Sequence, residues 1–107
     1  MMAPAFHVAQ ETAVWPPPPP LRELLLDADP DERQVADHLA HGELYVARSR
    51  GAAAGAIVIR QTGEDTWEIM NCSVAPEYRR HGCGTALVLR ALHIIRNKGA
   101  RYAELGT

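Results

Sequence analysis

The chain has 107 residues, of which 47% are hydrophobic, and these values are typical of one small globular domain with a single core. Its formal net charge of −2 argues against a nucleic-acid-binding protein, because such a protein usually carries a surplus of basic residues. The sequence has no run of the roughly 18 apolar residues that a membrane span needs, and its N-terminus lacks the order of a signal peptide. We therefore expect a cytoplasmic protein with no membrane partner.

The N-terminal part contains one expected strand, a proline run and the start of a helix. Residues 5–10 are short and apolar enough for a first strand. The five consecutive prolines at 16–20 lack backbone donors and predict an extended polyproline conformation, which would serve as a stiff connector. A docking site for a proline-binding module is the alternative, but the flanking residues do not support it. Residues 21–26 are expected to start a helix, and a proline at the first helical position suits it.

A second helix is expected within residues 29–43. Either Asp29 or Asp31 can cap it, and acidic residues occupy its first turn. His38 and His41 are three residues apart, which is a spacing that can hold a metal ion. No cluster of carboxylates or cysteines accompanies them in the sequence, so we expect no metal site.

Three strands are expected next, at residues 43–49, 54–61 and 66–74, and turn residues separate them. The short connections predict antiparallel hairpins. The second of these strands is apolar at consecutive positions, which indicates that both of its faces are covered.

The C-terminal part contains the clearest helical period, at residues 84–97, followed by a short strand at 101–105. The predicted buried arc of this helix consists of Leu87, Val88, Ala91, Leu92, Ile94 and Ile95. A crossover through a helix makes the last strand parallel to the strand at 66–74 if both belong to one sheet. Together these elements predict a mixed, mainly antiparallel α/β sheet of about five strands.

A glycine-containing loop separates the strand at 66–74 from the helix at 84–97. Residues 76–101 carry a local charge of +5, while the rest of the chain carries −7. The first turn of a helix leaves backbone N–H groups unpaired, and the helix dipole adds positive charge there. Gly82 and Gly84 have no side chain that would keep a phosphate oxygen from these groups. The loop therefore predicts a site for a small phosphate-bearing anion rather than for a polyanion.

The loop has the pattern Arg-x-x-Gly-x-Gly, from Arg79 to Gly84, after a strand that ends in Val-x-Pro. It is not a Walker loop, since GxxxxGK[ST] is absent, and GxGxxG fails because residue 87 is leucine. The pattern resembles the acetyl-CoA signature of the general N-acetyltransferase (GNAT) superfamily, Gln/Arg-x-x-Gly-x-Gly/Ala. The resemblance covers most of the chain. It implies one N-acetyltransferase domain over residues 1–107, with helices on both faces of the sheet.

The resemblance also implies a binding mode for acetyl-CoA, the expected co-substrate. Its pyrophosphate would lie on the backbone N–H groups of residues 80–85, with Arg79 or Arg80 contacting a phosphate by side chain. Its pantetheine arm would pair like an extra strand with residues 72–74. The implied cofactor-binding residues are Cys72, Ser73, Val74, Arg79, Arg80, His81, Gly82, Cys83, Gly84 and Thr85. The alternative for the loop is a tight turn that simply needs glycine.

In this family the amine of a small molecule or a protein attacks the acetyl thioester directly. Some members use a glutamate on the strand before the loop as general base, and Glu68 lies at the matching place. Strand alternation predicts that Glu68 shares a face with Met70, Cys72 and Val74, and apolar neighbours would favour proton uptake by its carboxyl group. The alternative is a solvent-facing strand glutamate.

The two cysteines, Cys72 and Cys83, form no CxxC pair, so we expect reduced and mostly structural thiols. A thiol at a helix N-terminus beside arginines could also be a reactive thiolate. The resemblance argues against Cys83 as a nucleophile, because the family transfers the acetyl group directly to the amine.

The resemblance implies that the family pattern is truncated here after the fifth strand. Family members usually continue with a helix, often carrying a tyrosine that protonates the leaving thiolate, and then two more strands. Three interpretations remain: a fragmentary acetyltransferase, a subunit completed by another chain or by strand exchange, and a degenerate domain that binds CoA without catalysis. An exposed edge on the final strand would favour a homodimer. An interaction module that uses the proline run is a further, separate class.

Overall fold

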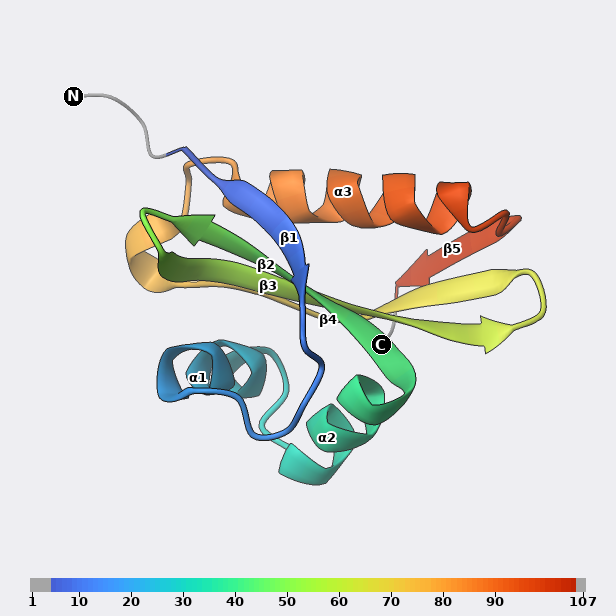
Figure 1. Ribbon diagram of the computed structural model, residues 1–107, viewed down its shortest axis with the longest axis horizontal. Helices are drawn as coiled ribbons and strands as arrows, with labels where there is room; N and C mark the ends of the chain where they lie inside the picture. The colour runs from blue at the N-terminus through green and yellow to red at the C-terminus, as the bar shows by residue number, and fades with distance from the viewer. Residues whose placement is uncertain (1–4, 106–107) are drawn as a thin grey trace.

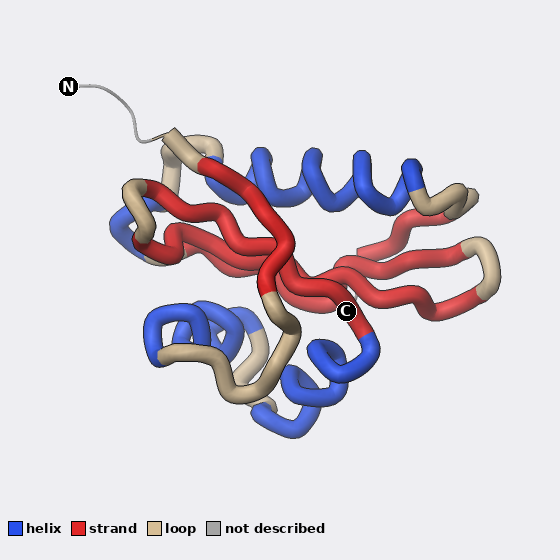
Figure 2. Tube along the Cα trace, viewed as in Figure 1, coloured by secondary structure: helices blue, strands red, loops and turns tan. Residues whose placement is uncertain are grey.

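A computed structural model describes residues 5–105 of the protein. It places one sheet between two layers of helices (Figure 1, Figure 2). The strands are β1 (His7–Glu11), β2 (Gly42–Ser49), β3 (Ala52–Gly63), β4 (Thr66–Val74) and β5 (Tyr102–Leu105). They lie in the order β1-β2-β3-β4-β5. The first four pair antiparallel to one another, and β5 pairs parallel to β4. The predicted mixed, mainly antiparallel sheet is confirmed.

The helices are α1 (Pro19–Ala28), α2 (Glu32–His41), the short 3-10 helix η1 (Pro76–Tyr78) and α3 (Cys83–Asn97). Pro18 has an extended backbone and is the N-cap of α1, and the last two prolines of the run are the first two residues of that helix. The expected proline at the first helical position is confirmed, whereas the expected extended run to residue 20 is too long, because the first helical positions need no N–H donor. Asp31, rather than Asp29, caps α2 and accepts hydrogen bonds from two backbone N–H groups at 3.0 and 3.3 Å.

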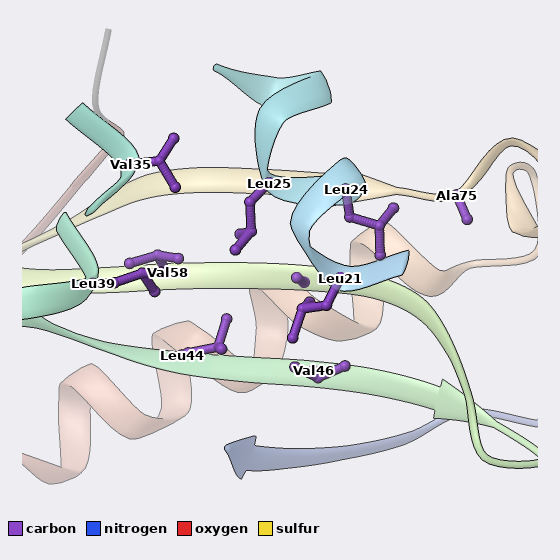
Figure 3. Packing of buried hydrophobic residues seen from close by; sticks show 10 residues of the cluster. Leu21, Leu24, Leu25, Val35, Leu39, Leu44, Val46, Val58 and Ala75 are labelled. Carbon is purple, nitrogen blue, oxygen red and sulfur yellow. The ribbon is translucent and has the colours of Figure 1, made fainter. Parts of the chain in front are cut away.

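Strand β3 is buried on both faces, as its apolar run predicts. Ala56 and Val58 belong to the core under α1 and α2, whereas Ile57 and Ile59 belong to the core under α3. Figure 3 shows the first of these cores, in which leucines of α1 pack onto β2 and β3. The alternation of side chains along one central strand thus separates the molecule into two cores.

Helix α3 lies along the other face of the sheet, and its buried residues are Cys83, Leu87, Ala91 and Ile95. The predicted buried arc is wrong at Leu92, whose side chain is 41% exposed. The buried stripe is narrower than the apolar arc, because a helix on a sheet contacts it along one line. Within the described part of the chain, no helix combines the length and the apolar character needed to cross a membrane.

Gly42 is the point where α2 passes directly into β2. A Cβ atom there would lie 2.5 Å from the carbonyl oxygen of Ile59 and 2.6 Å from that of His38. Both oxygens belong to the backbone, so relief would require a shift of a strand or a helix. We expect Gly42→Ala to lower the free energy of unfolding by about 1–3 kcal/mol, measured as a lower midpoint of urea denaturation.

The matched control is Gly63→Ala at the far end of β3. A Cβ atom at residue 63 would meet only Thr66, at 3.6 Å, which is an ordinary contact. This variant should unfold close to the wild-type midpoint. Equal midpoints for Gly42→Ala and the wild-type protein would contradict the close approach of α2 and β3.

Candidate active site

The loop between β4 and α3 is held at one end of the sheet by η1. Tyr78, the last residue of η1, packs against both cores and contacts the ring of Phe6 edge-on, with ring centroids 6.0 Å apart. The chain then turns through two left-handed residues, Arg80 with φ 65° and Gly82 with φ 82°. Gly82 is the N-cap of α3 and offers no side-chain acceptor to the helix. The loop thus approaches α3 with its backbone uncovered.

The first turn of α3 presents free backbone donors. The first helical hydrogen bond runs from the N–H of Ala86 to the carbonyl oxygen of Gly82, at 2.9 Å. Among residues 5–105, no backbone hydrogen bond outside the helices and strands is donated by an N–H group of residues 80–85. Together with the positive end of the helix dipole, these groups form a site that suits an anion. This arrangement agrees with the predicted phosphate-binding loop.

The side chains of this loop divide between solvent and core. His81 and Thr85 are exposed, while the Cys83 side chain is only 1% exposed and lies over Gly55 of β3. Burial raises the pKa of the Cys83 thiol, and the nearby Cys72 adds to the rise. A buried neutral thiol is a poor nucleophile, so the geometry agrees with a structural role for Cys83.

The two arginines of the motif differ in their surroundings. The Nε of Arg79 donates to the carbonyl oxygen of Val74 at 3.2 Å, and its Nη2 lies 3.2 Å from a carboxylate oxygen of Asp27 in α1. Arg80 is exposed, and no hydrogen bond or ion pair of its side chain is found in the described part of the chain. Arg79 therefore braces the loop against β4 and α1, and Arg80 is the arginine available to a ligand.

Next to this loop, the edge of β4 that faces β5 has no partner strand among residues 5–105. The pairing of β4 with β5 joins Thr66 to Tyr102 and ends where Ile69 meets Leu105. In its pairing with β3 the register shifts, so that Val58 pairs with Asn71, Ile59 pairs with Ile69, and Met70 is left without a partner. Met70 is thus the extra residue of a β-bulge, which sequence reasoning missed because the pattern of β4 alone contains no signal for it.

The predicted pantetheine-pairing residues Cys72, Ser73 and Val74 all follow the bulge. Among residues 5–105, no strand pairs with this part of β4 on the side of β5. Cys72 is exposed, Val74 is half-buried, and Ser73 is buried. The structure therefore brings the open edge of β4 and the free donors of α3 next to each other, through η1 and the loop.

The bulge also corrects the predicted face of Glu68. Glu68 pairs with Arg60, whose guanidinium reaches Asp37 of α2 at 2.8 Å, so Glu68 lies on the α1 and α2 face. Cys72 pairs with Ile57 and therefore lies on the α3 face. Simple alternation placed Glu68, Cys72 and Val74 together, which is wrong because the extra residue reverses the sides. Glu68 itself is half-buried.

Asn71, directly after the bulge, is a buried polar residue beside the candidate site that sequence reasoning did not select. It is 5% exposed, and its Nδ2 donates to the carbonyl oxygen of Leu25 in α1 at 3.0 Å. Its Oδ1 has no hydrogen-bond partner among the described residues. Asn71 thus ties the last turns of α1 to β4 beside the bulge. A polar residue within an otherwise apolar stretch was the available signal.

The histidine pair of α2 has polar neighbours on the same helix and on β3. The Nδ1 of His41 lies 3.2 Å from a carboxylate oxygen of Asp37, and the Nδ1 of His38 lies 3.3 Å from the guanidinium of Arg60. No group of three or more His, Cys, Asp or Glu side chains that could hold a metal ion occurs in residues 5–105. These histidines therefore belong to a polar surface of α2 and β3.

Comparison with known proteins identifies the family. The model of the acetyltransferase (GNAT) family matches residues 7–107. The uncharacterized N-acetyltransferase YvbK of Bacillus subtilis is 38% identical over 87 residues, which make up 81% of this chain and 56% of YvbK.

Solved structures show the same arrangement. An IAA acetyltransferase from Bacillus cereus is 33% identical with a TM-score of 0.87, over 96% of this chain and 66% of that one. A GNAT family acetyltransferase from Elizabethkingia anophelis with acetyl-CoA bound is 30% identical with a TM-score of 0.85, over 95% and 65%. The chain thus spans less than two thirds of the length of each of these relatives. By the family model and by its fold, the chain belongs to the acetyltransferase (GNAT) family.

Proposed function

We propose that this chain binds acetyl-CoA and takes part in transferring its acetyl group to a primary amine of a small molecule or a protein. The observation that carries the proposal is the set of free N–H groups at the start of α3, next to the open edge of β4. The pyrophosphate would accept hydrogen bonds from residues 80–85, and Arg80 would add a positive charge. The acetyl-CoA bound to the Elizabethkingia anophelis relative supports this assignment.

The pantetheine arm would run along the open edge of β4, where residues 72–74 offer backbone groups on the side away from β3. This path leads from the loop toward Met70. The extra residue of a bulge is left unpaired, so the Met70 N–H could donate to the thioester carbonyl oxygen as negative charge develops on it. Backbone geometry would thus polarise the acetyl group without a charged side chain.

Glu68 would serve as general base from the opposite face of β4. The amine nitrogen attacks the thioester carbonyl carbon, the C–S bond breaks, and CoA leaves as a thiolate. Glu68 would accept the proton lost by the amine, directly or through a water molecule. Because Glu68 faces α1 and α2 while Cys72 and Val74 face α3, the amine and the cofactor could approach the bulge from different sides.

Acetyl-CoA binding is tested at Gly84, in the first turn of α3. A Cβ atom at residue 84 would lie 3.5 Å from Cγ2 of Val74, so this position faces the proposed path of the cofactor. We expect Gly84→Val to weaken acetyl-CoA binding about tenfold or more, measured by calorimetry, because the branched side chain blocks access to the backbone donors. The free energy of unfolding should change by less than about 1 kcal/mol.

Two variants serve as controls for this experiment. Gly84→Ala adds only the Cβ atom that the structure accommodates, and it should retain most of the affinity. Gly99→Ala lies past the other end of α3 at φ 80°, so it should reduce stability without changing affinity. Wild-type affinity in a folded Gly84→Val protein would refute the phosphate-binding loop.

The general base is tested with Glu68→Gln. We expect the rate of acetyl transfer at pH 7 to fall about a hundredfold or more, followed by thiol release from acetyl-CoA with an amine panel. The loss should shrink at high pH, where more of the amine is already neutral. Glu104→Gln is the matched control, because Glu104 is exposed and is the residue of β5 that pairs with Glu68 of β4. Equal losses at neutral and high pH, or an equal effect of Glu104→Gln, would remove Glu68 from this role.

A homodimer through β5 is part of the proposal. All four residues of β5 are exposed, with Tyr102 at 59% and Leu105 at 74%, and its outer edge is unpaired within residues 5–105. An exposed edge strand promotes pairing with a second copy. Light scattering should give the mass of a dimer, and Leu105→Lys should give a monomer. Leu89→Lys, on the exposed side of α3, should leave the mass unchanged; a monomeric wild-type chain would contradict the dimer.

A further inference from the structure

We propose that the fold shields Lys98, the one lysine of this chain, from acetylation by the acetyl-CoA that the chain is proposed to bind. The sequence contains 11 Lys and Arg residues, and the other ten are arginine. The guanidinium of arginine stays protonated in proteins and does not accept an acetyl group. Lys98 is therefore the only side chain of the protein with an acetylatable amine.

Lys98 follows α3 directly and is held by two partners. Its Nζ lies 2.7 Å from Oε2 of Glu43 in β2 and 4.8 Å from the centroid of the Trp67 ring in β4. The side chains of Lys98 and Glu43 are 31% and 23% exposed. The ammonium group thus contacts a carboxylate and an aromatic face at once, and both contacts must be given up before the nitrogen can react.

Glu43 is itself fixed by a third residue. Its Oε1 accepts a hydrogen bond from the hydroxyl of Tyr45 at 2.6 Å. Burial alone would raise the pKa of Glu43, but the hydrogen bonds from Lys98 and Tyr45 outweigh it and hold the pKa below its usual value. Glu43 therefore remains a carboxylate at neutral pH, and the ion pair with Lys98 is maintained.

Acetylation of Lys98 requires a neutral amine with a free lone pair. The nitrogen would attack the thioester carbonyl carbon, the C–S bond would break, and the amine would lose a proton as the CoA thiolate leaves. An ammonium group that donates to Glu43 has no lone pair to offer. The reaction therefore has to break the ion pair and the contact with Trp67 before it can begin.

The position of Lys98 makes this shielding relevant to the proposed site. Its partner Trp67 precedes Met70 by three residues, which is about 10 Å along a strand. Trp67 packs with the core under α3, the face on which Cys72 also lies. The chain's only lysine thus contacts a residue of the strand on which the thioester is proposed to lie, about 10 Å from Met70 along that strand.

The experiment measures the acetylation rate of Lys98 with the acetyl ester of N-hydroxysuccinimide, using peptide mass spectrometry. A lysine-containing reference peptide in the same solution corrects for the reactivity of the reagent. Native protein is compared with protein unfolded in guanidinium chloride. We expect Lys98 to react about tenfold more slowly in the native protein, because the reaction must first break one charge-assisted hydrogen bond to Glu43.

Two variants separate shielding by Glu43 from general effects. Glu43→Gln removes the charge but keeps the size, and it should raise the native rate to within about threefold of the unfolded rate. Glu32→Gln breaks the exposed ion pair with Arg22 elsewhere on the surface and should change nothing. Equal rates in native and unfolded wild-type protein, or no increase in Glu43→Gln, would overturn the proposal.

A second arm replaces the ester with millimolar acetyl-CoA. We expect native Lys98 to react no faster than unfolded Lys98, whereas faster reaction of native Lys98 would mean self-acetylation and would overturn the shielding. The test of shielding with the ester does not depend on the proposed function. If calorimetry shows no acetyl-CoA binding, the function is wrong, while the comparison with the ester still decides whether Lys98 is shielded.

Discussion

The burial of β3 on both faces is the constraint on which the rest of the structure depends. Ala56 and Val58 require a cover on one side, and Ile57 and Ile59 require one on the other. Transfer of these side chains out of water stabilises the fold only when both helical layers are in place. Because α3 must lie over Ile57 and Ile59, its N-terminus comes to lie at the end of β4, where the loop can present its donors.

The bulge at Met70 then divides β4 into two parts with different neighbours. Before it, β4 pairs with β5 and directs Glu68 toward α2; after it, β4 has an open edge and directs Cys72 and Val74 toward α3. A strand of regular alternation would place Glu68, Cys72 and Val74 on one face. One extra residue thus allows a strand of nine residues to serve two faces of the sheet.

Much of this architecture could be predicted from local patterns. The period of two along β2 to β4, the period of 3.6 in α3 and the glycines of the loop each reflect an intrinsic preference of the backbone. The errors have different causes. Leu92 has the right period but lies beyond the line of contact, which depends on how α3 packs on the sheet. Pro19 and Pro20 enter α1 because the first turn of a helix tolerates proline.

The sequence by itself determined the order of the elements, the two-sided burial of β3 and the place of the glycine-containing loop before α3, since each depends on residues close together in the chain. The tertiary structure alone decided the face of Glu68, the contacts of Arg79 with Val74 and Asp27, and the ion pair of Lys98 with Glu43. Asp27 and Arg79 are 52 residues apart, and Glu43 and Lys98 come from different elements. Contacts of this kind arise only from strand register and helix packing, which no local pattern records.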